Sequence, residues 1–447
     1  MYRFRADRSR GAAARLKASR SDIAALTVVL LLLSGCARTS RSALDEEAGR
    51  YVRLAVALGE RDPESLDFYA GPADLVADLR RSPPSLPEIR REAEVLSARV
   101  LREAPVDPAD AARAGDLLAD LHAIAVRVDL LTGTRLPYDK ESTVLFGLAP
   151  APVDEHRLNA IRSQIAEIVG RGGRLVDRFA AFAARFTIPA DRIPAVMSAA
   201  VEECRRRTVA HVALPPGERV TLEIVRDKPW SAFSRYLGDA RSVIQINTDF
   251  RFTVDQALQV ACHEGYPGHH TRNTLMASTS TPVALGFSPA GHRGPERFVQ
   301  LMFSPEALVS EASAMLAVDV AFSPAERVRV ERDRLFPLAG LRPADAEQHV
   351  AIERLVGDLQ VVQADVARRY LDGKLELARA VVALEEQALV PHAEALIKYV
   401  NEYRSYVTTY TTGKTVLAAR LAACAGAHPT EDERWRCFEK EMLKHRI

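Results

Sequence analysis

Apolar residues recur every three or four positions along most of the chain, which is the spacing of amphipathic helices. The pattern is clearest in the Ala- and Leu-rich stretch from Asp110 to Leu131. Three proline-rich segments interrupt it, at 82–87, 148–152 and 214–217. We therefore predict a mainly α protein whose helical N-terminal region, 43–214, continues as one unit into a second region, 215–447.

The pattern becomes strand-like after the third proline-rich segment. Val220, Leu222 and Ile224 alternate with polar residues, as in a half-buried strand, and a second short strand is expected at 243–247. The two strands can pair as a small sheet, one edge of which is a candidate for pairing with an extended peptide. Helical spacing returns at Thr253, so we expect the small β element to lie beside the helix that begins there.

The N-terminus is strongly basic ahead of a short apolar run. Residues 1–20 carry seven Lys and Arg side chains against one Asp, and the run 23–33 is shorter than the roughly 20 residues of a membrane-spanning helix. This order is typical of a signal peptide. The run ends in Leu-Ser-Gly-Cys at Cys36, which resembles the lipobox of bacterial lipoproteins. We therefore predict a signal peptide at 1–35, a lipid on Cys36 that anchors the protein to a membrane of the cell envelope, and a polar tether at 36–42.

Two other interpretations of this segment remain open. An ordinary signal peptide, or an N-terminal anchor helix with an incidental cysteine, is compatible with the same pattern. No Asp follows Cys36, since the next residues are Ala37 and Arg38, so no signal for retention in an inner membrane is visible.

The charge balance bears on whether the protein binds nucleic acid, and the cysteines bear on which disulfides it forms. Lys plus Arg number 60 and Asp plus Glu number 59, so no strong field favours nucleic acid. Export permits disulfides, and Cys424 and Cys437 flank a short loop with Gly426 and Pro429, which makes them a candidate pair. Cys262 follows apolar helical neighbours, and we interpret it as a buried, unpaired thiol, with metal ligation as the alternative.

The candidate chemistry lies on the helix that begins at Thr253. Its capping-box start leads to the string HEGYPGHH at 263–270. Many zinc peptidases hold their metal with a His-Glu pair on a helix and a further His downstream, because neutral imidazoles bind the ion and the Glu accepts a proton from its water.

The identity of the second histidine ligand is open on geometry alone. On an unbroken helix, His270 would lie about 20° around the axis from His263 and His269 about 120° away, which favours His270. Pro267 removes a helical hydrogen bond and is flanked by glycines, so a kink there makes either histidine possible.

The string resembles the hallmark of a bacterial family, domain of unknown function 885, whose members are predicted lipoproteins and suspected metallopeptidases of the gluzincin type. The hallmark is His-Glu-x-x-Pro-Gly-His, often followed by a second His, and 263–270 matches it throughout. The resemblance implies a large helical metallopeptidase-like fold that binds one zinc ion. It also implies that His263 and His269 are ligands and that Glu264 is the general base. The position of His270 varies in the family, so the resemblance ranks it below His269 as a ligand or as a neighbour of the site.

Two further segments are similar to the family and imply more site residues. Its third ligand lies in a helix written Glu-Gly-Trp-Ala-x-Tyr-x-Glu, and the counterpart at 311–318 agrees at Glu311 and Ala314 but differs at the other named positions. The resemblance implies that Glu311 is the third ligand; a solvated helix charge is the alternative. A C-terminal Tyr-x-x-Gly matches at 410–413 and implies that Tyr410 donates a hydrogen bond to the reaction's oxyanion, with a packed tyrosine as the alternative.

Three other side chains are candidates for contact with substrate. Arg404 and Lys414 could hold a substrate carboxylate, although each could equally be a surface charge. His292 lies between the ligand segments and is a candidate for lining the cleft.

These observations favour a zinc-dependent peptidase that acts on a peptide substrate and is anchored to the cell envelope. Two alternatives share the same residues: a zinc hydrolase of another amide or ester, such as a cell-wall fragment, and a catalytically inactive binding lipoprotein. The altered helix at Glu311 favours the inactive protein, whereas the retained Glu264 argues against it.

Overall fold

The computed structural model describes residues 43–103, 107–150, 152–228, 230–278, 294–427 and 429–443. The predicted signal peptide 1–35, Cys36, the tether and His292 lie outside the described residues.

The N-terminal part is a group of helices with its own apolar core. A helix at 43–61 and a short strand, β1 (Leu66–Tyr69), precede α2 (Ala73–Arg81), α3 (Leu86–Arg102) and α4 (Pro108–Leu131). Pro87 and a capping box between Ser85 and Glu88 start α3, so one of the predicted breaks is a helix N-terminus. A cluster of buried apolar side chains joins these helices to β5 (Val299–Leu301), which pairs antiparallel with β1.

Helices make up most of the remaining chain as well. Those before the sheet are α5 (Tyr138–Phe146), α6 (Glu155–Val169), α7 (Leu175–Ala184) and α8 (Ile193–Val209). Those after it are α9 (Val254–Val260), α10 (His269–Ser278), α11 (Pro305–Ala321), α12 (Pro324–Val330), α13 (Phe336–Ala339), α14 (Ala346–Leu359), α15 (Val361–Leu371), α16 (Leu377–Ala388), α17 (Glu394–Tyr403), α18 (Lys414–Ala425) and α19 (Glu431–Phe438).

A three-stranded sheet lies beside the helix that bears the motif. Both predicted strands are present, as β2 (Arg219–Val225) and β4 (Arg241–Asn247), and they pair in parallel. The third strand, β3 (Ala232–Gly238), was not predicted; it pairs antiparallel with β4 through a two-residue turn whose residues both have positive φ. The prediction of a mainly α fold with a small β element next to the motif-bearing helix is therefore confirmed.

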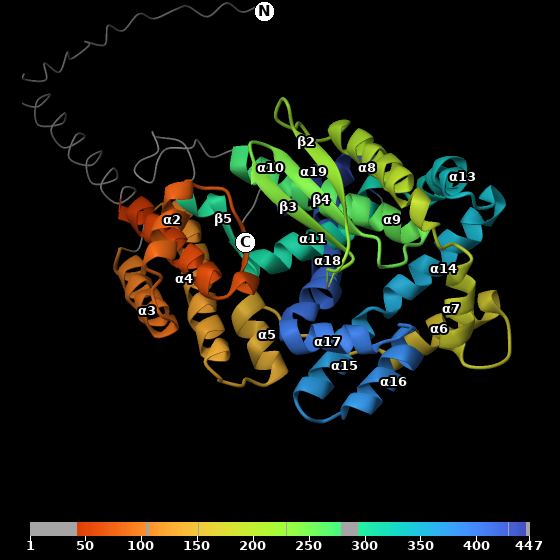
Figure 1. Ribbon diagram of the computed structural model, residues 1–447, viewed down its shortest axis with the longest axis horizontal. Helices are drawn as coiled ribbons and strands as arrows, with labels where there is room; N and C mark the ends of the chain where they lie inside the picture. Colours follow the sequence, from red (N-terminus) through yellow and green to blue (C-terminus); the bar gives the residue numbers. More distant parts are fainter. Residues whose placement is uncertain are drawn as a thin grey trace, which may run out of the picture.

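The central helix of the molecule is α11, which crosses the middle between the sheet and the α15–α17 helices (Figure 1). It is buried on nearly every side, so it does not show the one-sided apolar stripe of a surface helix. The largest apolar cluster surrounds it and includes residues from both sides of position 214. Within the described ranges, no single helix has the length and apolar character to cross a membrane; α11 and the following 324–339 segment meet these criteria only as a pair bent by 79°.

Candidate metal centre

The motif-bearing helix starts as the sequence predicts and then breaks at the proline. Thr253 Oγ1 accepts a hydrogen bond from the backbone N–H of Gln256, and the Gln256 side chain accepts one from the backbone N–H of Thr253. Helix α9 widens into a π-helical turn at Ala261–Gly265, and a new helix, α10, begins at His269. Such π-helical turns occur frequently at functional sites.

The chain packs so closely against the π-helical turn at Gly268 that this position after the proline requires glycine. Its backbone N–H donates to the carbonyl of Cys262 at 3.0 Å, which folds the loop back onto the π-helical turn. A Cβ at this position would lie 1.9 Å from the carbonyl oxygen of His263, so only glycine fits without a backbone shift. The close approach brings the start of α10 next to His263.

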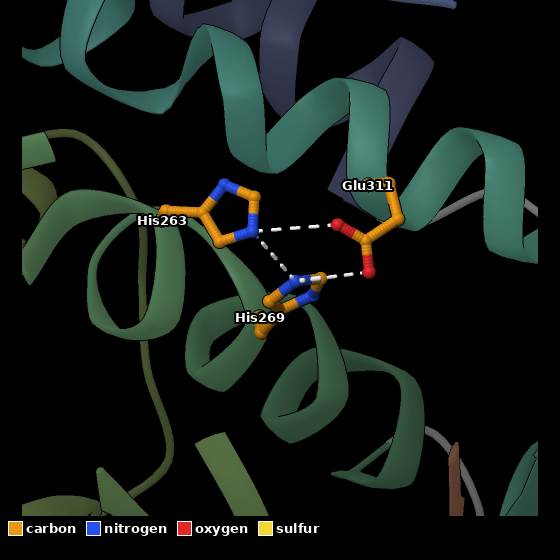
Figure 2. A group of neighbouring side chains, drawn as sticks. All are labelled: His263, His269 and Glu311. Atoms are coloured by element: carbon orange, nitrogen blue, oxygen red, sulfur yellow. Dashed lines mark hydrogen bonds and ion pairs between the residues drawn. The ribbon is translucent and has the colours of Figure 1, made fainter. Parts of the chain in front are cut away.

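Three predicted ligands converge at this point (Figure 2). His263 comes from the π-helical turn, His269 from the first turn of α10 and Glu311 from the middle of α11. The Nε2 atoms of the two histidines lie 3.2 Å apart. Glu311 Oε2 lies 3.4 Å from His263 Nε2, and Glu311 Oε1 lies 3.6 Å from His269 Nε2. All three side chains are largely buried.

The geometry and chemistry of this trio fit a zinc ion. Its candidate ligand atoms all lie within 4.8 Å of one another. Ligands placed 2.0–2.1 Å from a tetrahedral zinc ion lie about 3.3–3.4 Å apart, close to the separations observed here. Glu311 Oε2 is buried, and no described residue gives it a hydrogen bond, which leaves it available to an ion. Two imidazoles and one carboxylate also form a known catalytic zinc set.

Neighbouring hydroxyl groups orient two of the three ligands. Tyr406 donates a hydrogen bond to Glu311 Oε1 at 2.9 Å, and the tyrosine is fully buried. His269 Nδ1 lies 3.2 Å from Ser310 Oγ, so the ring has a polar neighbour on the side away from the cluster. Partners of this kind fix ring orientation and ligand basicity in metal sites.

Electrostatic coupling within the cluster is strong. Burial lowers the pKa of His269, but Glu311, Glu264 and Asp67 raise it, and the net pKa is about 9. Burial raises the pKa of Glu311, but His269 and His263 lower it, and the net pKa is below its usual range. Without a metal, the two side chains therefore form an ion pair that a bound cation would replace.

Glu264 and Tyr410 flank the cluster. Glu264 lies in the π-helical turn directly after His263 and is part-exposed, and its carboxylate has no hydrogen bond or ion pair with another described residue. The Tyr410 ring lies 6.5 Å from the His263 ring, between centroids. Its hydroxyl accepts a hydrogen bond from Tyr399 at 3.3 Å, which leaves the Tyr410 proton free to be donated elsewhere. Burial raises the pKa of Tyr410 well above its usual value, so this proton is retained.

The structure separates His270 from the cluster. His270 is fully buried, its Nδ1 lies 2.8 Å from Ser242 Oγ on β4, and its Nε2 lies 3.2 Å from Glu218 Oε2. The kink at Pro267 accounts for this, because α10 begins anew at His269 and the rotation of an unbroken helix does not apply.

The two cationic candidates for substrate binding are engaged within the fold. Arg404 is paired through Nε with Glu141 Oε2 at 2.7 Å, and Glu141 also accepts hydrogen bonds from Ser405. Arg404 therefore holds α5 to the segment after α17, so its charge is paired within the fold, and its binding of a substrate carboxylate stays a prediction. Lys414 lies 3.5 Å from Asp319 in an ion pair.

All four cysteines of the described residues are paired, which differs from the prediction for Cys262. Cys424 and Cys437 are joined as a disulfide between α18 and α19. Cys262 is not an unpaired thiol, because it forms a disulfide with Cys204 of α8, 58 positions earlier. Both side chains are fully buried, so the bond ties the π-helical turn, one residue before His263, to the packed face of α8.

Two residues near the His263, His269 and Glu311 cluster were not predicted from the sequence. Tyr406 belongs to a series with Tyr399, Tyr403 and Tyr410, whose helical spacing could have indicated a shared face. Asp67 on β1 accepts a hydrogen bond from Gln300 Nε2 at 2.6 Å. Burial raises its pKa to about 6; His269 opposes this shift, and Glu311 and Glu264 reinforce it. No pattern around Asp67 linked it to the motif.

Comparison with known proteins gives distant structural likenesses. No protein-family model matches the chain, and no curated protein sequence matches it. A proposed lipoprotein of Colwellia psychrerythraea has 12% identity and a TM-score of 0.47, over 81% of this chain and 68% of that one. The M32 carboxypeptidase of Deinococcus radiodurans R1 has 17% identity and a TM-score of 0.48, over 90% of each chain. Metallocarboxypeptidase 1 of Trypanosoma cruzi has 11% identity and a TM-score of 0.40, over 92% and 91%. All three TM-scores lie below 0.5, so the case for function rests on the side chains of the metal centre.

Proposed function

We propose that this protein is a zinc-dependent peptidase. The observation that carries the proposal is the convergence of His263, His269 and Glu311 around a point that fits zinc, with Glu264 directly after the first ligand. The resemblance of the 263–270 string to suspected metallopeptidases supports the same assignment. The proposed cofactor is one zinc ion per chain.

A zinc ion held by these three side chains would keep a position open for water or substrate. Three protein ligands are typical of catalytic zinc, whereas structural zinc is almost always held by four. When bound, zinc would polarise the substrate carbonyl and lower the pKa of a water molecule towards 7.

Glu264 would act as the general base. It follows a ligand and is not held by another described side chain, so its carboxylate can accept a proton from the attacking water. The same carboxyl group then delivers this proton to the leaving amine, as a general acid. Such proton transfer contributes about 10²–10⁴-fold to rate.

Tyr410 would stabilise the oxyanion. Its proton is retained because of the raised pKa, and Tyr399 occupies the acceptor side of its hydroxyl, so the hydroxyl can donate to the oxygen that becomes negative. Gly413 supports this placement, because its Cα lies close enough to α11 that an added Cβ would come within 3.3 Å of Ala312 Cβ. The turn that carries Tyr410 is thus packed directly on the helix that carries Glu311.

The peptide could approach along the sheet. The strand order is β2-β4-β3, so β3 is an edge strand, and it lies next to α10, which bears His269 (Figure 1). An extended peptide can add to such an edge through backbone hydrogen bonds. We further propose that the protein is a lipoprotein of the cell envelope, anchored through Cys36, which rests on the lipobox-like end of the apolar run.

The assignment is tested by hydrolysis of a mixed peptide library. The soluble protein lacking residues 1–36 is loaded with zinc, its metal content is measured, and cleavage positions are read by mass spectrometry. We expect one zinc per chain and cleavage at defined bonds, and we expect a Glu311→Ala protein to have neither. A zinc-loaded protein that cleaves no peptide but hydrolyses cell-wall fragments would favour the other hydrolase. A zinc-loaded protein that cleaves neither would favour the inactive binding protein.

A further inference from the structure

The short loop between the two histidine ligands is held by a carboxylate outside the motif, and we propose that Glu218 is a positioning residue for the metal centre. Glu218 would set the placement of His269 relative to His263. This inference rests on the proposed zinc site.

The loop needs support because helical hydrogen bonding stops there. Pro267 has no N–H, and α10 starts only at His269. Two backbone hydrogen bonds connect the loop to the π-helical turn, from Tyr266 N to Ala261 O and from Gly268 N to Cys262 O. The distance between the ligands therefore depends on what holds the side chains around the loop.

Glu218 holds the loop at both ends. Its Oε2 accepts a hydrogen bond from the Tyr266 hydroxyl at 2.6 Å and faces His270 Nε2 at 3.2 Å. Its Oε1 accepts from Arg205 Nε at 2.9 Å, which ties the same carboxylate to α8. Tyr266 and His270 enclose the segment Pro267-Gly268-His269, so one carboxylate connects to the residues on either side of the second ligand.

The protonation state of Glu218 determines which groups donate and which accept in these hydrogen bonds. The Glu218 side chain is 3% exposed. Burial raises its pKa, but His270, Tyr266 and Arg205 lower it to about 2, so the carboxylate is ionised and only accepts hydrogen bonds. His270 must therefore carry its proton on Nε2, and in the neutral ring Nδ1 accepts from the Ser242 hydroxyl of β4. His270 thus connects the sheet to Glu218 and directs its Nε2 away from the metal centre.

In this arrangement His270 and Tyr266 are not metal ligands but hold the loop that carries His269, through their contacts with Glu218. A charge-assisted hydrogen bond is roughly twice as strong as a neutral one, and the contacts here are shielded from water. The turn that carries His269 is thereby fixed before any metal binds. Removing the central carboxylate would leave the ligands present but free to move apart.

The test compares Glu218→Gln with Glu223→Gln, a matched control on β2 whose exposed carboxylate accepts a hydrogen bond from Gln245 Nε2 at 2.7 Å. Tyr266→Phe is the second test variant, since it removes one hydroxyl and keeps the buried ring. Zinc affinity is measured by competition with a chelator. The visible absorption of the cobalt-substituted protein reports ligand geometry, and circular dichroism reports folding of the metal-free chain.

We expect Glu218→Gln and Tyr266→Phe each to weaken zinc binding by about tenfold, the lower end for loss of an outer hydrogen-bonding partner, and to change the cobalt spectrum. Glu223→Gln should match the wild type in both measurements. The inference would be overturned if the folded test variants kept wild-type zinc affinity and an unchanged cobalt spectrum. It would also be overturned if these variants lost thermal stability without a change in either measurement. If Glu218→Gln does not fold, Tyr266→Phe decides. A wild-type chain that binds no zinc would instead overturn the proposed function, and the inference with it.

Discussion

The disulfide between Cys204 and Cys262 provides a prediction that separates stability from metal binding. Replacing both residues with Ala removes the covalent link and avoids placing a polar group in a fully buried site. The bond closes a loop of 58 positions. Loop-closure entropy for that length corresponds to about 4 kcal/mol of stability at 25 °C.

The second disulfide is a matched control. Cys424 and Cys437 are separated by 13 positions, for which the same relation gives about 3 kcal/mol. Neither is next to a predicted ligand, whereas Cys262 immediately precedes His263 in the π-helical turn. Both double-Ala variants should therefore be less stable, but only the Cys204/Cys262 variant should also bind zinc more weakly, by about tenfold.

Two assays measure the two effects independently. Urea unfolding of the metal-free proteins gives the loss of stability, and chelator competition at a temperature where all variants are folded gives the zinc affinity. Wild-type zinc affinity in the Cys204/Cys262 variant would contradict this prediction. Equal loss of zinc affinity in both variants would also contradict it, since the effect would then follow general stability.

Three further predictions follow from individual contacts and from the sequence. Tyr406→Phe should weaken zinc binding about 10–100-fold, because it removes the hydrogen-bond donor to Glu311 Oε1. Tyr403→Phe is the control and should not weaken zinc binding, since the Tyr403 hydroxyl donates to Glu64 instead. Chelator competition measures the zinc affinity of both variants. The pKa of Glu218 falls from 4.5 to about 2 on folding, so its ionised form contributes about 3 kcal/mol above pH 4.5, which is lost as the pH falls towards 2. The unfolding free energy of the metal-free Glu218→Gln protein should therefore depend less on pH between 4.5 and 2 than that of the wild type. Mass spectrometry of the native protein should find an acylated N-terminus at Cys36, and a mature N-terminus elsewhere would contradict the lipobox interpretation.

Local pattern was sufficient for the main features of the fold. Helical spacing, proline breaks and the capping box at Thr253 describe interactions between residues close in sequence, and the structure contains the elements that they predict. Strand β3 was missed because 232–238 lacks a clear alternation of apolar and polar residues. It is defined by its hairpin pairing with β4, and the turn residues Asp239 and Ala240 are not one of the common sequence signals for a two-residue hairpin turn.

Contacts between distant segments explain what the sequence did not show at the site. The Cys204 partner of Cys262 is set by how α8 packs on the π-helical turn, and no local pattern encodes that packing. Tyr406 lies 95 positions after Glu311 in the sequence and Asp67 lies 244 positions before it. Helix geometry alone favoured His270 as a ligand, whereas the structure brings His269 to the cluster because the chain restarts its helix after Pro267.

The most direct test of the zinc peptidase assignment is the Glu264→Gln substitution. Gln keeps the shape of the side chain but cannot accept a proton, and Glu264 is not among the clustered ligands. The variant should therefore retain one zinc per chain, measured by elemental analysis, while peptide hydrolysis falls about 10²–10⁴-fold, or about 3–5 kcal/mol of activation free energy. A variant that retains zinc and hydrolyses peptides at the wild-type rate would contradict the account, and loss of zinc would show that Glu264 is itself a ligand.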